Sequence, residues 1–421
     1  AFESGSHCFF SFATALVVAL CEPDSKAVAK LKKQCAKTWG RAALDAAKVY
    51  PDYRVMFDEM GKSIDAIMVA TPDHTHAGVA AHAMTLGKHV YCQKPLTHSV
   101  YEARLLARLA KKYRVATQMG NQGNSFDWCR RVAEWIWAGE IGEVSEVHCW
   151  TDRPIWPQGL NLPTEEMAVP DTLDWDLWIG SAEKRPYADK WPDDNPIPKM
   201  CPEAWKGAAV YHPFNHRGWY DFGAGALGDM GCHWANTIYK ALDLDHPSMI
   251  SASCTRRSDV AFPLASVVTF DYPKRGNFPE LRFTWCDGLI KPPAPKELAG
   301  APLPKEGVMY VGTKAKMLIS MEKQSEMRIL DPKLDAQAKT IPATLPRRGQ
   351  IWDEWLTACK GGEKAGCDFS WARRITEFVL LGNLAVRTGG SVAFDPKTMH
   401  VANNPDADAL LRLKYYNGWS L

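Results

Sequence analysis

Short apolar runs alternate with amphipathic stretches along the first third of the chain. The apolar runs cover positions 16–21, 66–70, 89–92 and 115–119, and stretches of helical periodicity cover 25–38, 76–86 and 100–113. A short apolar run followed by an amphipathic stretch is typical of a strand followed by a crossover helix. We therefore predict a parallel sheet of Rossmann type here, with Gly87 as the C-cap glycine of the helix over 76–86.

The pattern changes beyond residue 123. A helix over 126–138 leads to longer strands, expected at 144–151, 250–254, 267–272 and 281–286, and no regular helix separates the last three. Their sheet is predicted to be mixed or antiparallel, because parallel neighbours need crossovers. Two loops, at 156–206 and 290–307, are long enough to be functional. Helices at 351–359 and 370–387 follow.

The whole pattern predicts an α/β protein with two domains. Residues 1–123 are expected to form an N-terminal Rossmann domain that binds a dinucleotide. Residues 124–421 are expected to form a C-terminal α/β domain that binds the substrate, with the final helices packing back on the first domain.

The composition is that of an ordinary globular enzyme. With 46% hydrophobic and 23% charged residues, a chain of 421 residues can bury two cores. The formal charge of +2 leads us to expect neither nucleic acid nor an anionic membrane as a partner. No apolar run reaches 18 residues, and the stretch 9–20 lacks the basic flank and cleavage site of a signal peptide. The expected partner is a small substrate of low charge.

Cysteine and tryptophan are both frequent. None of the 12 cysteines lies in a C-x-x-C pair or in a Cys/His cluster with zinc spacing, so we predict no metal site and mostly free thiols in the core. Many of the 17 tryptophans fall between Trp128 and Trp234. Flat aromatic faces suit the C–H faces of sugar rings, although core packing is the commoner explanation.

Glu22 follows the first apolar run directly. An acidic residue at the end of this strand of a dinucleotide fold holds the ribose hydroxyls of adenosine, which predicts NAD rather than NADP as the cofactor. The alternative is an acidic residue that stabilises the start of the next helix. Asp24 fits that capping role better than Glu22 does.

The glycine-rich fingerprint that should precede Glu22 is incomplete. If Gly5 is its third glycine, the first glycine falls before Ala1 and Phe2 occupies the second position. No strand fits before residue 5. We therefore expect the natural chain to begin earlier, so that the first strand and the phosphate-binding loop are missing or atypical in this sequence.

Two further segments follow strands of the predicted parallel sheet, where ligands bind. In Ala70-Thr71-Pro72-Asp73-His74-Thr75-His76, backbone N–H groups such as that of Thr71 can face the cofactor, and Pro72 belongs to the same cofactor-binding loop. His74 and His76 are either cofactor contacts or ordinary polar residues at a helix start. In Tyr91-Cys92-Gln93-Lys94-Pro95, the proline directs the loop. The charge of NAD⁺ next to Lys94 would favour its neutral amine, which suits proton exchange with a hydroxyl.

A glycine-rich turn in the second half leads into Asp229 and His233. Four residues separate them, so in a helix both lie on one face and can grip one hydroxyl. A neutral histidine can accept the O–H proton while an alcohol loses hydride, which is worth roughly 10² to 10⁴ in rate. The alternative is a buried Asp–His hydrogen bond that only locks the helix.

Taken in order, these motifs resemble the oxidoreductase family of glucose-fructose oxidoreductase, inositol dehydrogenase and the rhizopine-catabolism protein MocA (Gfo/Idh/MocA). The matching segments are Ala70-Thr71-Pro72 followed by histidine, Gln93-Lys94-Pro95 in place of Glu-Lys-Pro, and Asp229 with His233. Val311-Gly312-Thr313-Lys314 resembles a strand turn of the family's second domain.

The resemblance implies a second domain with an open-faced, mainly antiparallel sheet, and assembly as a homodimer or homotetramer. It makes Lys94 and His233 the proton-handling pair and Asp229 the residue that orients a sugar hydroxyl. Arg217 and Trp219 are then expected near the nicotinamide and substrate, and Gln118, Asn121 and Gln122 would line the same cleft. Gln93 removes a negative charge beside Lys94 and so further favours the neutral amine.

Three functions remain open on this basis. The first is an NAD-dependent dehydrogenase that oxidises or reduces a ring hydroxyl of a sugar, glycoside (possibly at C3) or cyclic polyol. The second is a glycosidase or lyase that recycles NAD through oxidation, elimination and hydride return. The third is a non-catalytic dinucleotide-binding protein, which the joint presence of Lys94, Asp229 and His233 disfavours. Both a cytoplasmic location and export with a removed twin-arginine signal fit the resemblance.

Overall fold

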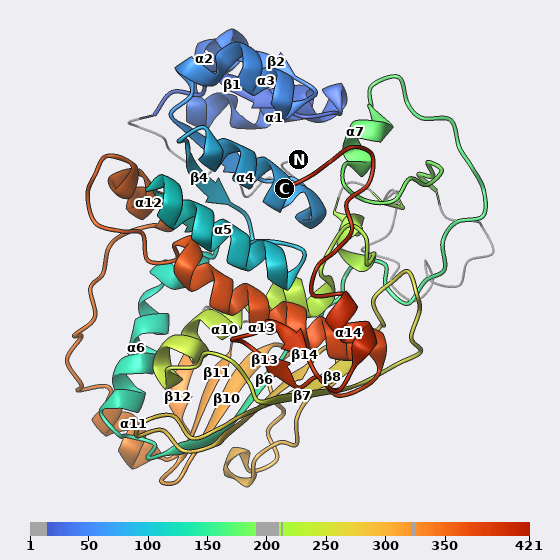
Figure 1. The fold of residues 1–421 in the computed structure, drawn as a ribbon. Helices are drawn as coiled ribbons and strands as arrows, with labels where there is room; N and C mark the ends of the chain where they lie inside the picture. Colours follow the sequence, from blue (N-terminus) through green and yellow to red (C-terminus); the bar gives the residue numbers. More distant parts are fainter. Residues whose placement is uncertain (1–14, 191–209, 212–213, 321–325) are drawn as a thin grey trace.

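The computed structural model describes residues 15–190, 210–211, 214–320 and 326–421. The expected glycine-rich loop with Phe2 and Gly5 falls outside these residues. Along the described chain the predicted α/β class is confirmed, because parallel ladders come first and a mostly antiparallel sheet of seven strands follows (Figure 1).

Two parallel ladders build the first part of the molecule. β1 (Ala19–Cys21) pairs with β2 (Lys48–Tyr50), and β3 (Ala66–Val69), β4 (His89–Cys92) and β5 (Thr117–Met119) pair in that order. The helices of this part are α1 (Ser25–Trp39), α2 (Arg41–Ala46), α3 (Tyr53–Met60), α4 (His76–Thr85) and α5 (Val100–Tyr113). Three elements were not predicted: β2, α2 and α3. Each has at most eight residues, which is too short for a clear periodic signal.

Helix caps set where the helices of this part begin and end. Asp24 caps α1 by accepting a hydrogen bond from the Lys26 amide at 2.9 Å, as its sequence position predicted. Ser99 and Glu102 form a reciprocal capping box at the start of α5. Gly87 follows the end of α4 with φ of 73°, the left-handed conformation that glycine tolerates. The parallel pairing of β3 with β4 places the loops that follow these two strands at one edge of their ladder.

The second sheet has the strand order β12-β11-β10-β6-β9-β8-β7. Its strands are β6 (Val144–Trp150), β7 (Met249–Cys254), β8 (Ser266–Tyr272), β9 (Leu281–Cys286), β10 (Gly307–Gly312), β11 (Lys316–Ser320) and β12 (Glu326–Ile329). Every neighbouring pair is antiparallel except β6 with β9. The mixed or antiparallel sheet predicted from the sequence is therefore confirmed.

Helices cover one face of this sheet and join it to the first part of the chain (Figure 1). They are α6 (Asp127–Trp137), α10 (Gly225–Leu242) and α13 (Phe369–Thr388). On α13, Phe378 packs against Phe270 and Phe283 of the sheet, with ring centroids 4.3 and 4.9 Å apart. From the same helix Glu377 pairs with Arg104 of α5 at 2.8 Å. Thus α13 contacts the sheet on one side and the Rossmann helices on the other.

The opposite face of the sheet is partly covered by the chain itself. Leu298 and Leu303, from the loop that precedes β10, pack against Trp150 and Leu318. That loop holds the short 3₁₀ turn η6 (Lys296–Leu298). Elsewhere on this face Arg282 and Asp271 pair at 2.8 Å across neighbouring strands. The sheet is therefore covered by helices on one face and partly open on the other.

The remaining elements lie in the long loops and near the C-terminus. They are α7 (Trp175–Ile179), α11 (Pro332–Ala338), α12 (Ile351–Cys359), β13 (Phe394–Asp395), β14 (His400–Val401) and α14 (Pro405–Ala409), together with the 3₁₀ turns η2 (Gly61–Ser63), η3 (Asp73–Thr75), η4 (Gln122–Ser125) and η5 (Asn215–Gly218). Within the described ranges, no helix combines the length and the apolar character that crossing a membrane requires.

Most described tryptophans between Trp128 and Trp234 are core residues. Six are buried: Trp135, Trp150, Trp156, Trp178, Trp219 and Trp234. Nine cysteines in the described residues are free thiols, six of them buried. Core packing, the commoner explanation for the tryptophans, therefore accounts for these six.

Candidate active site

Lys94 stands in the loop after β4 and reaches towards the second half of the chain. The Gln93 amide donates to Val69 O at 2.9 Å, which continues the pairing of β3 and β4 into this loop, and the Lys94–Pro95 peptide is cis. Lys94 Nζ lies 2.5 Å from Asp229 Oδ1 and 2.8 Å from Asp229 O, both in α10. The structure therefore brings these two predicted residues into direct contact.

Arg217 completes an ion cluster around Asp229. Its Nε donates to Asp229 Oδ1 at 3.1 Å from the turn η5, and its guanidinium lies over the Phe214 ring at 4.6 Å. Burial alone would raise the pKa of Asp229, but the positive charges of Lys94 and Arg217 outweigh it and hold that pKa well below its usual range. The carboxylate of Asp229 therefore stays ionised.

His233 lies one helical turn beyond Asp229, on the same face of α10. Burial, together with the charges of Lys94 and Arg153, lowers the pKa of His233 to about 3. Its imidazole is therefore neutral at pH 7. In the part of the chain that the structure describes, no hydrogen bond joins the His233 ring to Asp229, so a lock of that kind does not hold the helix.

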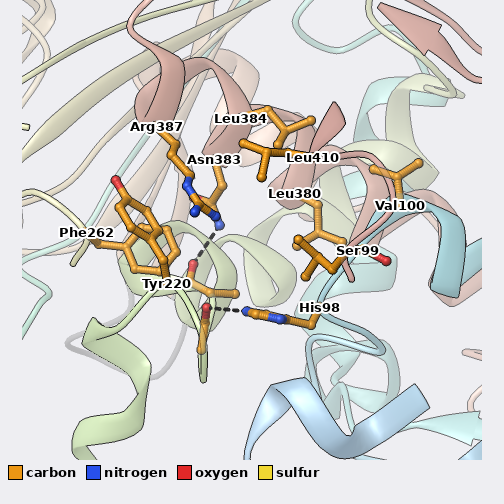
Figure 2. A pocket seen from close by; sticks show the side chains of 13 residues that line it. His98, Ser99, Val100, Tyr220, Phe262, Leu380, Asn383, Leu384, Arg387 and Leu410 are labelled. Carbon is orange, nitrogen blue, oxygen red and sulfur yellow. Dashed lines mark hydrogen bonds between the residues drawn. The ribbon is translucent and has the colours of Figure 1, made fainter. Parts of the chain in front are cut away.

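The glycine-rich turn before α10 is anchored from both halves of the chain. His98 Nε2 donates to Gly223 O at 3.0 Å, and Asn383 Nδ2 donates to Ala224 O at 2.8 Å (Figure 2). Gly225 has φ of 64°, and a Cβ there would lie 2.7 Å from the Phe262 ring. These contacts fix the start of α10 and hence the positions of Asp229 and His233.

His74 and His76 are buried beside this centre, with exposures of 3% and 1%. His76 contacts Pro95 O through Nδ1 at 2.9 Å and Thr71 O through Nε2 at 2.8 Å. His74 Nε2 donates to Ile179 O at 3.0 Å. His76 thus connects the loop after β3 with the loop after β4, and His74 attaches the turn η3 to α7. Direct contact of either ring with the cofactor stays a prediction.

His74 should make the stability of the fold depend on pH. Burial lowers its pKa to about 3, whereas the unfolded chain has a histidine pKa of about 6.5. Between these values the unfolded state binds one more proton, so the free energy of unfolding falls as the pH falls below 6.5 and is restored above it. We expect His74→Gln to reduce the slope of the unfolding free energy, measured with urea between pH 4.5 and 6, by about 1.4 kcal/mol per pH unit.

The comparison requires that His74→Gln keeps the wild-type circular dichroism spectrum at pH 7. A slope equal to that of the wild-type chain would show that His74 does not stay neutral in the folded state.

Three of the residues predicted to hold NAD border a cavity of about 110 Å³. It is lined by Glu22 at the end of β1 and by Thr71 and Pro72 after β3. Thr75 Oγ1 donates to Thr71 Oγ1 at 2.7 Å and so steadies that loop. Gln93 Nε2 is buried with no hydrogen-bond partner in the described ranges. The Glu22 carboxylate, which can accept hydrogen bonds from a ribose, and the buried Gln93 amide both fit a bound dinucleotide.

The remaining predicted residues differ in their contacts. Asn121 Nδ2 donates to Cys232 O at 2.7 Å, next to His233, whereas Gln118 Oε1 accepts from the Cys367 amide at 3.1 Å. Gln122 lies half-buried in η4. Trp219 is 1% exposed, and its Nε1 donates to Val210 O at 2.9 Å. Asn121 thus connects the end of β5 to α10, and Trp219 packs in a small core behind the ion cluster.

Two residues near the site were missed in the sequence. The positive charge of Arg153 helps to lower the pKa of His233. Arg153 follows β6 closely, so its position just after a predicted strand could have indicated a site residue. Trp419 lines the cavity at Glu22. No local pattern indicates that contact, because almost 400 residues separate the two in sequence. No cluster of three or more His, Cys, Asp or Glu side chains suited to a metal occurs in the described residues.

Comparison with known proteins gives a family match for the first part of the chain. Residues 7–121 match the model of an oxidoreductase family with an NAD-binding Rossmann fold. Residues 7–121 belong to the Gfo/Idh/MocA family. The Gfo/Idh/MocA segment contains Glu22, the Thr71 loop and Lys94, so the cofactor of this chain is NAD.

Relatives of the Gfo/Idh/MocA segment include proteins named for sugar and polyol chemistry. The rhizopine catabolism protein MocA of Rhizobium meliloti is 30% identical over 93 residues, which are 22% of this chain and 29% of that protein. An inositol 2-dehydrogenase of Pseudomonas fluorescens is 30% identical over 142 residues, 34% of this chain and 40% of that protein. The chain therefore matches less than half the length of these relatives.

The fold extends beyond the matched segment. The WlbA dehydrogenase of Bordetella pertussis, solved in complex with NADH and UDP-GlcNAcA, superposes with a TM-score of 0.58. The superposition covers 90% of this chain and 91% of that one at 12% sequence identity. At this identity the likeness shows a shared fold, in which a Rossmann part and a sheet part lie side by side.

Proposed function

We propose that this chain is an NAD-dependent oxidoreductase that oxidises or reduces a ring hydroxyl of a sugar, a glycoside or a cyclic polyol. The observation that carries the proposal is the contact of Lys94 with Asp229, one helical turn from a neutral His233. The group lies where the end of β4 meets α10, next to loops of the Gfo/Idh/MocA segment.

Three side chains, Lys94, His233 and Asp229, have separate roles in the transfer of the hydroxyl proton. Bound NAD⁺ supplies a hydride acceptor. Lys94 donates a hydrogen bond to the substrate oxygen and stabilises the negative charge that grows there. His233 accepts the hydroxyl proton, and in reduction it returns that proton to the oxygen. Asp229 holds Lys94 in place through its carboxylate and its backbone carbonyl.

The charge balance supports this division. Asp229 contacts two cations, Lys94 and Arg217, and the positive charge of Lys94 also acts on the His233 ring. The positive charge of Lys94 disfavours a proton on His233 while the substrate is a neutral alcohol. Negative charge on the substrate oxygen offsets it and so favours proton transfer as the hydride leaves.

The substrate class is supported by the relatives rather than by the cavity alone. Inositol 2-dehydrogenases are among them, and the WlbA structure carries a nucleotide sugar with NADH. The relatives also include a 2,7-anhydro-N-acetylneuraminate hydratase of Escherichia coli, 30% identical over 95 residues, a name that denotes chemistry with no net oxidation. The hydratase name keeps NAD recycling as a second candidate.

An assay of net turnover separates these functions. The purified chain is incubated with NAD⁺ and a panel of inositols, free sugars, methyl glycosides and aryl glycosides, and NADH is followed by absorbance alongside release of the aglycone. We expect NADH equal to the substrate consumed, with the glycoside left intact. Aglycone release without net NADH would instead establish NAD recycling, and tight NADH binding without any turnover would leave a non-catalytic protein.

A further inference from the structure

The cavity behind Glu22 is closed by residues from three distant parts of the chain. Cys21 and Glu22 border it from β1, and Tyr53 and Met56 border it from α3. Trp178 of α7 and Trp419 near the C-terminus form the side away from the Rossmann strands. In Figure 1 the C-terminal segment runs past α7 to end near α4. One wall of this cavity therefore comes from outside the Gfo/Idh/MocA segment.

Residues 415–419, here called the C-terminal strap, are held by several hydrogen bonds. Tyr415 Oη donates to Glu102 Oε1 at 2.6 Å, and the Tyr416 amide donates to Ser181 O at 3.1 Å. Asn417 Nδ2 donates to Gly180 O and Ala182 O, both at 2.9 Å. The strap is thus attached to α5 on one side and to the loop after α7 on the other.

The Trp419 indole fits between these elements. Its ring centroid is 5.6 Å from that of Tyr53, and the Arg54 guanidinium lies 5.1 Å from the ring. A Cβ at Gly78 would come within 3.6 Å of the indole, and one at Gly180 within 3.4 Å. Glycines on two sides therefore leave the indole in close contact with the backbone, and its position is well defined.

We propose that the C-terminal strap closes the adenine end of the NAD site and that Trp419 is the wall against which the adenine ring packs. Glu22 holds the adenosine ribose, so the base lies in the cavity next to it. The cavity has two tryptophans in its lining, Trp178 and Trp419, and flat aromatic faces suit the face of a planar base. The other end of the dinucleotide lies at Lys94, away from the strap. The inference rests on the NAD site of the proposed function.

The test uses ADP-ribose, which keeps the adenine end of NAD and lacks nicotinamide. Its Kd is measured by calorimetry for the wild-type chain, Trp419→Ala and Trp419→Phe. We expect Trp419→Ala to raise the Kd about tenfold, and Trp419→Phe to raise it about threefold because a smaller ring remains.

Trp137→Ala is the matched control. This tryptophan at the end of α6 is 49% exposed and lies outside the lining of the cavity, so its replacement should leave the Kd unchanged. Hydrogen exchange of the wild-type chain is an independent measurement that needs no variant. ADP-ribose should slow exchange at residues 415–419.

The outcomes are distinct. An unchanged ADP-ribose Kd in Trp419→Ala, or unchanged exchange in the strap when ADP-ribose is bound, would overturn the inference while the proposed function stands. A wild-type chain that binds neither NADH nor ADP-ribose would overturn both.

Discussion

Lys94→Ala and His233→Ala are each expected to lower kcat at least about a hundredfold, because Lys94 stabilises the negative charge on the substrate oxygen and His233 accepts the hydroxyl proton. The Kd for NADH should change by less than about threefold. Cofactor binding does not involve proton transfer, so a change that affects only the transition state leaves this Kd nearly unchanged. Steady-state rates of NADH formation and fluorescence titration with NADH measure the two quantities.

Lys111→Ala is the control for the loss of a lysine. Lys111 is exposed on the last turn of α5, so its replacement should leave both kcat and the Kd for NADH as they are. Near-wild-type kcat in both Lys94→Ala and His233→Ala would show that the proton-handling pair has been assigned wrongly.

Asp229→Ala is expected to lower the free energy of unfolding by about 3 kcal/mol. Lys94 and Asp229 have side-chain exposures of only 13% and 14%, so removing the carboxylate leaves Lys94 and Arg217 as neighbouring cations with little water to screen them. Loss of one partner of a buried ion pair is costly for this reason. Denaturant unfolding, with cofactor absent, measures the change.

A second carboxylate in an ion pair provides the comparison. Asp271 pairs with Arg282 at 2.8 Å, but these side chains are 39% and 64% exposed, so Asp271→Ala should cost less than about 1 kcal/mol. The double variant Lys94→Ala/Asp229→Ala should be more stable than the sum of the two single changes predicts, because the stranded cation is gone. Additive losses would mean that the contact contributes no coupling energy.

Much of the fold could be predicted from the sequence because its central elements have strong patterns. The strand at 89–92 and the helices at 100–113 and 351–359 have the predicted bounds. The three strands β10, β11 and β12 were not predicted. β10 and β11 are buried over most of their length, and such runs do not alternate between apolar and polar residues. β10 pairs with β6, which lies more than 150 residues away, and β11 and β12 follow β10 in the sheet.

The candidate site could be predicted where one motif carries its own chemistry. Asp229 and His233 share a helix face at a spacing that is visible in sequence, and Lys94 follows a recognisable strand. Lys94 and Asp229 form an ion pair across 135 residues of sequence. No local pattern predicts such a contact, so only the resemblance to a family placed the two residues in one site. The buried position of Trp219 could not be predicted. It lies in a motif next to the site, but sequence position alone does not indicate whether a large ring faces a cleft or packs in the core.

His76 has a consequence for anyone who wishes to redesign this protein. Its ring joins the carbonyls of Thr71 and Pro95, so it connects the loop at the cofactor cavity with the loop that carries Lys94. A displacement of about 1 Å at a reacting group can cost about a hundredfold in rate. Libraries aimed at new substrates should therefore leave this buried histidine unchanged, because the displaced loops would lower the rate for every substrate in the same way.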